Sequence, residues 1–163
     1  MTGYPVGPVT LYFGARHRHA EFLYGDELEA AASVPANHPT HVLASLRLAF
    51  SRDSGSKVYI QHLMEQDGEA LWQALGVRRG SFYLCGPTWP EADVRCADAV
   101  VFTGKHTVSA PPATPPPPYR QLRSQVEAAV VSAFVRYGGM TKDEAVTEIR
   151  RMKDEKRYVL EVY

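Results

Sequence analysis

Two cations, a hydroxyl group, a phenol and an amide occur within eleven residues near the middle of the chain. They are Ser51, Arg52, Lys57, Tyr59 and Gln61. A phosphate monoester is bound by cations together with several hydrogen-bond donors, and an arginine can meet two of its oxygens at once. The ring of Tyr59 can also cover the face of a purine. The pattern predicts recognition of an adenosine phosphate, although a solvated loop with ordinary charges has the same composition.

Two further candidate positions follow other apolar segments. Arg16 comes two positions after the end of residues 9–14 and either adds a second contact to an anion or is an ordinary exposed charge. Cys85 ends the apolar segment 81–85, and Gly86 behind it lets a ligand or another backbone approach closely. A buried, inert thiol is the alternative interpretation of Cys85.

Several other reaction classes lack the residues that they need. His17 and His19 are close, but no acidic or cysteine partner stands at a recognisable metal-ligand spacing, so no metal site is predicted. The two cysteines, Cys85 and Cys96, are too few for a disulfide framework or a four-cysteine zinc pattern. The sequence contains neither a nucleophile elbow nor a P-loop motif. It therefore gives no support to a serine hydrolase or a P-loop NTPase.

The composition is that of one globular domain of 163 residues with 45% hydrophobic residues. Lys plus Arg and Asp plus Glu total 18 each, which argues against a dedicated nucleic-acid binder. No apolar run approaches the roughly 18 to 20 residues of a membrane span, and no signal peptide is visible. We expect a cytoplasmic protein with no membrane segment.

Apolar patterns predict strands that alternate with helices. We expect strands at residues 9–14, 45–50, 81–85 and 158–163. We expect helices at residues 20–32, 59–75, 91–101 and 119–137, and from Thr141, which forms a capping box with Glu144, to about Lys156. The Pro-rich stretch 104–118 is expected to be a surface insertion in a single domain that spans residues 1–163.

This order predicts an α/β fold with a doubly wound, mostly parallel sheet and helices on both faces. In such sheets a ligand binds beyond the carboxyl ends of the strands. Arg16, Ser51 with Arg52, and Cys85 with Gly86 all follow predicted strands at that edge. The last strand ends on Tyr163, whose ring could cover a flat ligand.

Four segments resemble the NADPH-binding C-terminal lobe of the diflavin reductases, which belong to the ferredoxin–NADP reductase-like superfamily. These segments are LYFGARHRHAEFLYGDEL, AFSRDSGSKVYIQHLMEQDGEALW, FYLCGPTWPEADV and GGMTKDEAVTEIRRMKDEKRYVLEVY. They cover nearly the whole chain apart from the Pro-rich insertion. CGPTWPEADV and RYVLEVY look most like the flavoprotein subunit of NADPH-dependent sulfite reductase, and the microsomal NADPH–cytochrome reductases are the close alternative.

The resemblance implies a role for each candidate residue. The cluster that holds the 2′-phosphate and adenine of NADP is matched by Ser51, Arg52, Lys57, Tyr59 and Gln61. Arg16 matches an arginine that contacts the pyrophosphate, and Cys85, followed by Gly86, matches the cysteine beside the nicotinamide. Glu161 takes the place of a C-terminal acid near the hydride-transfer site, where many relatives carry Asp. Tyr163 matches the terminal aromatic residue that stacks on the flavin.

In the family, a hydride passes from NADPH to FAD, and electrons continue through FMN to an acceptor such as the sulfite reductase haemoprotein. The resemblance therefore implies NADP(H) as the cofactor of this chain, with FAD and FMN held by domains that it lacks. A preceding strand and a G-x-G-T-G-x-A-P loop of the family are also missing. That strand is normally central, so we expect a free sheet edge or a substitute strand. We further expect the chain to be inactive without the FAD-binding domain.

Two other functions remain compatible with the sequence. One is a non-catalytic nucleotide-binding module that has lost its flavin partner. The other is an interaction domain that uses the sheet edge and the Pro-rich loop as docking surfaces.

Overall fold

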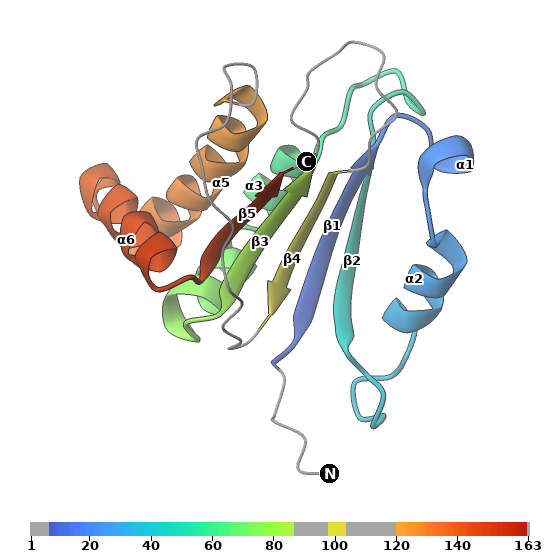
Figure 1. Ribbon diagram of the computed structural model, residues 1–163, viewed down its shortest axis with the longest axis horizontal. Coiled ribbons are helices and arrows are strands. Elements are labelled where there is room, and N and C mark those ends of the chain that lie inside the picture. Colours follow the sequence, from blue (N-terminus) through green and yellow to red (C-terminus); the bar gives the residue numbers. More distant parts are fainter. Residues whose placement is uncertain (1–6, 87–97, 104–119, 163) are drawn as a thin grey trace.

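A five-stranded sheet forms the centre of the computed structural model, which describes residues 7–86, 98–103 and 120–162 (Figure 1). Its strands are β1 Val9–Ala15, β2 Leu43–Phe50, β3 Ser81–Gly86, β4 Asp98–Thr103 and β5 Tyr158–Val162. Its helices are α1 Arg18–Glu21, α2 Gly25–Ala32, α3 Ile60–Gln66, α4 Gly68–Trp72, a π-helical turn η1 at Gln73–Val77, α5 Arg120–Gly138 and α6 Lys142–Asp154. No helix in these described ranges is long and apolar enough to cross a membrane.

The strand order is β2-β1-β4-β3-β5. Strands β1 and β2 are parallel, and so are β3 and β5. Strand β4 lies between β1 and β3 and is antiparallel to both, so four strands run in one direction and β4 runs against them. The α/β class with a mostly parallel sheet is therefore confirmed.

The helix expected at residues 91–101 is wrong where the structure describes it, because residues 98–101 belong to β4. Residues 91–97 lie outside the described part. The sequence Asp98-Ala-Val-Val-Phe-Thr103 is rich in β-branched and aromatic side chains, which favour a pleated strand. In addition, the inner edges of β1 and β3 need partners for their backbone groups, and β4 supplies them on both sides. A substitute strand thus fills the centre of the sheet.

Two other predicted helices are interrupted. The segment 20–32 contains the end of α1 and the whole of α2, separated by a turn in which Tyr24 adopts a left-handed conformation with φ of 56°. The segment 59–75 contains α3, α4 and the start of η1, with the break at Asp67. The expected helix at 119–137 is confirmed as α5.

The capping box predicted for the last helix is present. Glu144 donates its backbone N–H to Oγ1 of Thr141 at 3.3 Å, and Thr141 donates its own N–H to Oε2 of Glu144 at 2.8 Å. Helix α6 begins directly after Thr141 and turns the chain into β5. The Pro-rich stretch 104–118 lies outside the described residues.

Helices cover both faces of the sheet. Tyr12 and Ala49 point into the main core, together with Phe82 and Leu84 of β3, and pack there against buried side chains of α3 to α6. The neighbouring Phe13 faces the other way and packs against Phe22 and Phe50 at ring-centroid distances of 5.0 and 6.5 Å. Figure 1 shows α1 and α2 on this second side, away from α5 and α6.

Candidate functional site

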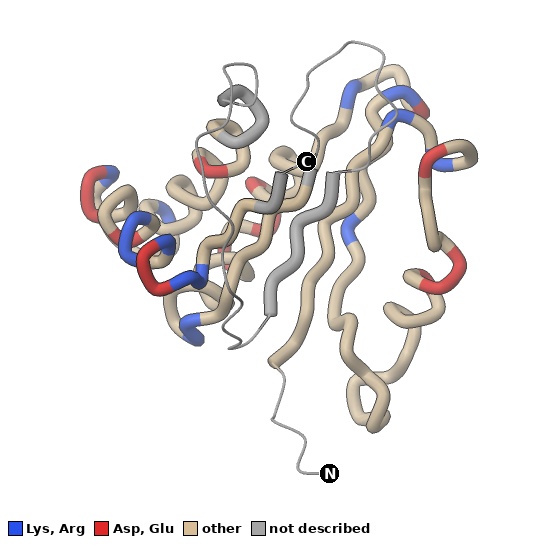
Figure 2. Tube along the Cα trace, viewed as in Figure 1, with Lys and Arg blue, Asp and Glu red and all other residues tan. Residues whose placement is uncertain are grey.

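The carboxyl ends of β1 and β2 stay paired beyond the last residues of the two strands. Ser51 donates its backbone N–H to the carbonyl oxygen of Ala15, and Arg52 donates to that of Arg16, both at 2.9 Å. These bonds place Arg16 and Arg52 next to each other on adjacent chain segments. Figure 2 shows lysines and arginines gathered at this end of β1 and β2. The predicted proximity of the two arginines is thus present in the backbone.

Ser51 and Arg52 have different surroundings, although they are neighbours in the sequence. Ser51 is only 9% exposed, and its Oγ donates to the carbonyl oxygen of Ala15 at 3.4 Å. Arg52 is exposed. Ser51 therefore fixes the turn, while Arg52 presents a charge to solvent that an anion can reach.

The guanidinium group of Arg16 is held by Glu21 of α1. It donates to Oε1 of Glu21 from Nε at 2.9 Å and from Nη2 at 2.8 Å. Oε2 of Glu21 accepts the backbone N–H of Arg16 at 2.8 Å. The hydrogen bond from the Arg16 side chain is the largest cause that holds the pKa of Glu21 below its ordinary value. Glu21 thus fixes the orientation of the Arg16 side chain, which is 21% exposed.

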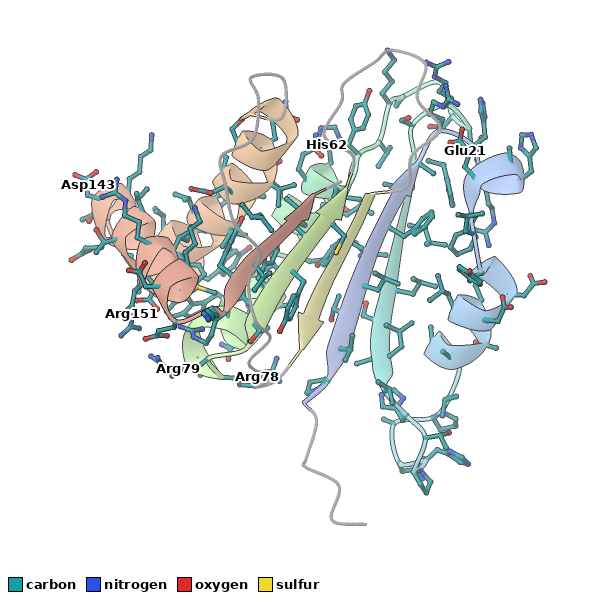
Figure 3. All side chains as sticks on the ribbon, in the orientation of Figure 1. Glu21, His62, Arg78, Arg79, Asp143 and Arg151 are labelled. Atoms are coloured by element: carbon teal, nitrogen blue, oxygen red, sulfur yellow. The ribbon has the colours of Figure 1, made fainter. Side chains whose placement is uncertain are left out.

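Lys57 and Tyr59 lie on the segment that connects β2 to α3. Both side chains are exposed, Tyr59 to 40%. The Tyr59 ring stands at 5.6 Å from the ring of His62, edge to face, and the Tyr59 backbone N–H donates to Nδ1 of His62 at 3.3 Å. Figure 3 shows His62 and Glu21 toward the same end of the sheet. The connecting segment that follows Arg52 thus presents an aromatic ring and a cation to solvent.

Gln61 differs from the other members of this cluster because it is buried. It is 7% exposed, and its Nε2 donates to Oε1 of Gln125 in α5 at 3.0 Å. Its own Oε1 has no hydrogen-bond partner within the described residues. In this structure Gln61 ties α3 to α5, which positions the start of α3 behind Tyr59.

The second predicted group lies at the carboxyl ends of β3 and β5. Cys85 pairs with Glu161 in the parallel register, and Gly86 pairs with Val162. Cys85 is half-buried. The backbone thus brings Cys85 and Glu161 to the same level of adjacent strands. Tyr163 lies outside the described residues.

Sequence reasoning missed one side-chain group at this edge. Asp53, from the turn after β2, lies against His17 and His19, and one ligand atom from each of the three is within 4.8 Å of the others. The parallel register of β1 and β2 could have revealed this group. His17 follows Arg16 and Asp53 follows Arg52, so pairing of the two arginines brings the next residues together as well.

The chain is similar in sequence to several known proteins. The chain is 31% identical over 161 residues, 99% of its length, to the NADPH–cytochrome P450 reductase of Drosophila melanogaster. It is 32% identical over its whole length to the probable sulfite reductase [NADPH] flavoprotein component of Schizosaccharomyces pombe. Over 92 residues it is 46% identical to the corresponding component of Saccharomyces cerevisiae. The resemblance to the diflavin reductase family is confirmed.

The chain corresponds to only part of each of these diflavin reductases. It spans 18% of the fruit-fly protein and 12% and 8% of the two fungal proteins. No family model matches the chain. The names of the relatives describe NADPH-dependent flavoprotein reductases, so the chain is related to a region of such enzymes.

Proposed function

We propose that this chain is the NADP(H)-binding domain of a diflavin reductase and spans residues 1–163. The observation that carries the proposal is the backbone pairing of Arg16 with Arg52 at the carboxyl edge of the sheet. Two adjacent arginines, the exposed Lys57 and the exposed ring of Tyr59 provide what an adenosine phosphate needs: positive charge, hydrogen-bond donors and an aromatic face.

The members of the site receive distinct roles in this proposal. Arg52 and Lys57 bind the 2′-phosphate, which separates NADP from NAD, and Ser51 shapes the turn that presents them. Tyr59 covers the adenine. Arg16, oriented by Glu21, contacts the pyrophosphate. Gln61 supports the site indirectly, because its hydrogen bond to Gln125 fixes α3 against α5.

We place the nicotinamide end at Cys85, Gly86 and Glu161. When bound, NADPH supplies the hydride and a flavin accepts it, while the protein orients the two rings. Cys85 and Glu161 stand at one level on β3 and β5, where they can contact the reacting ring from neighbouring strands. Gly86 leaves room for the ring to approach, and Tyr163 covers the flavin. The FAD and FMN belong to further domains, and the electron acceptor is a partner protein such as the sulfite reductase haemoprotein.

Titration calorimetry with 2′,5′-ADP tests the nucleotide part of the proposal. The matched ligand is 5′-AMP, which lacks only the 2′-phosphate. We expect saturable binding of 2′,5′-ADP and at least about tenfold weaker binding of 5′-AMP, because charge-assisted phosphate contacts contribute about 1.5–3 kcal/mol. Equal affinities would show that Ser51 to Gln61 do not bind the 2′-phosphate.

The redox part needs a separate experiment. The chain is joined to the FAD-binding domain of a relative, and NADPH is added without oxygen. Loss of the oxidised-flavin absorbance on addition of NADPH, and not of NADH, supports the reductase. Nucleotide binding without flavin reduction would instead support the non-catalytic module.

A further inference from the structure

The side chains of His17, His19 and Asp53 form a group that the nucleotide site does not use. Nδ1 of His17 donates to Oδ1 of Asp53 at 2.9 Å, and the rings of His17 and His19 lie 5.5 Å apart between centroids. His17 has an extended backbone with φ of −130° and ψ of 128° just before α1 begins. The two imidazoles gather beside the carboxylate at this point of the chain.

We propose that His17, His19 and Asp53 bind one divalent transition-metal ion of the zinc class. Two imidazole nitrogens and one carboxylate oxygen are ligands that Zn²⁺ accepts, whereas Mg²⁺ and Ca²⁺ prefer oxygen ligands alone. Three protein ligands leave the fourth position of a tetrahedral site to water.

The distances suit such an ion after small side-chain rotations. The ligand atoms now lie within 4.8 Å of one another. Around a tetrahedral zinc ion with bonds of about 2.0–2.2 Å, ligand atoms are about 3.3–3.6 Å apart. His17 and Asp53 already stand closer than that, so most of the adjustment falls on His19, which is exposed and free of tight packing.

Two properties of the Asp53 carboxylate suit it to bind a metal ion: its fixed orientation and its charge. The backbone N–H of Arg18 donates to Oδ2 of Asp53 at 2.8 Å, which fixes the carboxylate and leaves Oδ1 toward the histidine. This hydrogen bond, followed by the one from His17, holds the pKa of Asp53 below its ordinary value. Asp53 is therefore ionised at neutral pH. The ion would take the place of the hydrogen bond that now joins His17 to Asp53.

Two of the neighbouring cations are paired with carboxylates, which reduces their repulsion of the ion. The guanidinium group of Arg16 is paired with Glu21, and that of Arg18 is paired with Glu29. Arg18 also stands over the ring of Phe22 at 5.3 Å, so its charge is held against α1 and α2. The side chains of His17 and Asp53 are 38% and 33% exposed, so an ion can enter from solvent.

Metal titration of the full chain tests this proposal. Protein freed of metal with EDTA is titrated with Zn²⁺ in competition with a chromophoric chelator. We expect one saturable site that millimolar Mg²⁺ does not occupy. His17→Ala, His19→Ala and Asp53→Asn should each weaken Zn²⁺ binding by at least about tenfold, since even residues that only support a metal ligand have effects of this size.

His38→Ala is the matched control, because it removes an exposed histidine that hydrogen-bonds only locally, to Thr40, among the described contacts. Its Zn²⁺ affinity should equal that of the unchanged protein. Unfolding followed by circular dichroism gives a second readout: Zn²⁺ should raise the midpoint of the unchanged chain and not that of Asp53→Asn.

Unchanged Zn²⁺ affinity in Asp53→Asn or in both histidine variants would overturn the proposal, as would equal loss in His38→Ala. None of the three ligands is assigned to the nucleotide. Titrating the same variants with 2′,5′-ADP therefore shows whether the metal site or the nucleotide site has failed.

Discussion

The backbone N–H of Arg52 donates to the carbonyl oxygen of Arg16 at 2.9 Å, so two arginines 36 positions apart begin side by side at one edge of the sheet. Neither the strand pattern nor the charge of either residue alone creates a phosphate site. The proposed phosphate site depends on the parallel register of β1 and β2, which continues past the ends of both strands.

Removal of the exposed arginine tests this arrangement. Arg52→Ala should weaken 2′,5′-ADP binding roughly tenfold to hundredfold, because a charged hydrogen-bonded contact contributes about 1.5–3 kcal/mol. Binding of 5′-AMP should change little. Titration calorimetry measures both ligands. Arg78→Ala is the control, since Figure 3 shows Arg78 at the opposite end of the sheet. A similar loss in both variants would mean that general charge, not position, attracts the nucleotide.

Glu21 should make stability depend on pH. Its pKa is lowered from the ordinary value of 4.5 in the folded chain, chiefly by the hydrogen bond from the Arg16 side chain. The stabilisation is therefore complete above pH 4.5 and is lost as the pH falls through the lowered pKa. Glu21→Gln should reduce the free energy of unfolding by roughly 1–3 kcal/mol at neutral pH.

Urea denaturation between pH 7 and pH 3 measures this difference. The gap between the unchanged chain and Glu21→Gln should narrow on acidification. A gap that stayed constant over the whole range would show that the charge of Glu21 does not stabilise the fold.

Tyr12 anchors the sheet to the break between α3 and α4. Its hydroxyl donates to Oδ2 of Asp67 at 2.9 Å, and the same oxygen accepts from Nε of Arg47 at 2.7 Å. Burial, followed by the charge of Asp67, raises the pKa of Tyr12. Tyr12→Phe should lower the free energy of unfolding by about 0.5–1.5 kcal/mol, because Arg47 still satisfies the carboxylate.

The control for this change is Tyr137→Phe, at a tyrosine that is 39% exposed. Its unfolding midpoint in urea should stay within error of the unchanged chain. If both variants unfold alike, the hydrogen bond of Tyr12 adds nothing to stability.

Trp72 requires a glycine on the π-helical turn that follows α4. A Cβ on Gly76 would stand 2.1 Å from Cζ3 of Trp72, whose ring packs edge to face on Phe134 at 5.1 Å. Gly76→Ala must therefore displace the indole from the core, at a cost of roughly 1–3 kcal/mol. Thermal unfolding should show a lower midpoint, whereas Gly55→Ala, where a Cβ meets nothing within 4 Å, should not.

Cys85 should affect the redox step and not nucleotide affinity. In the chain joined to an FAD-binding domain, Cys85→Ser should slow flavin reduction by NADPH at least about tenfold, or about 1.4 kcal/mol of activation free energy. Binding of 2′,5′-ADP should be unchanged. Rapid-mixing absorbance follows the flavin, and Cys96→Ser is the control. Equal rates for both variants would remove Cys85 from the reaction.

Local patterns predicted most of the fold. Short apolar segments located β1 and β3, alternating apolar residues located β2 and β5, and the Thr141–Glu144 pair located the start of α6. These features depend on neighbours in the sequence. The ends of the strands then predicted which residues share an edge, and Arg16, Arg52 and Cys85 are found there.

Long-range pairing explains what local patterns missed. The segment 98–101 fits a helical period, yet it is a strand because β1 and β3 offer unpaired backbone groups on both sides. Asp53 was overlooked as a partner of His17 because 36 residues separate them and only the register joins them. Local patterns also gave no sign of the hydrogen bond between Gln61 and Gln125, because 64 residues separate them.

Strand β4 sets the spacing between the two halves of the sheet, because it lies between β1 and β3. It keeps β1 and β3 two strand spacings apart, about 9.5 Å, and so sets how far the arginine pair stands from Cys85. A dinucleotide that reaches both ends must match this width. Shortening or displacing β4 would therefore change the spacing between the arginine pair and Cys85 without replacing any of these residues.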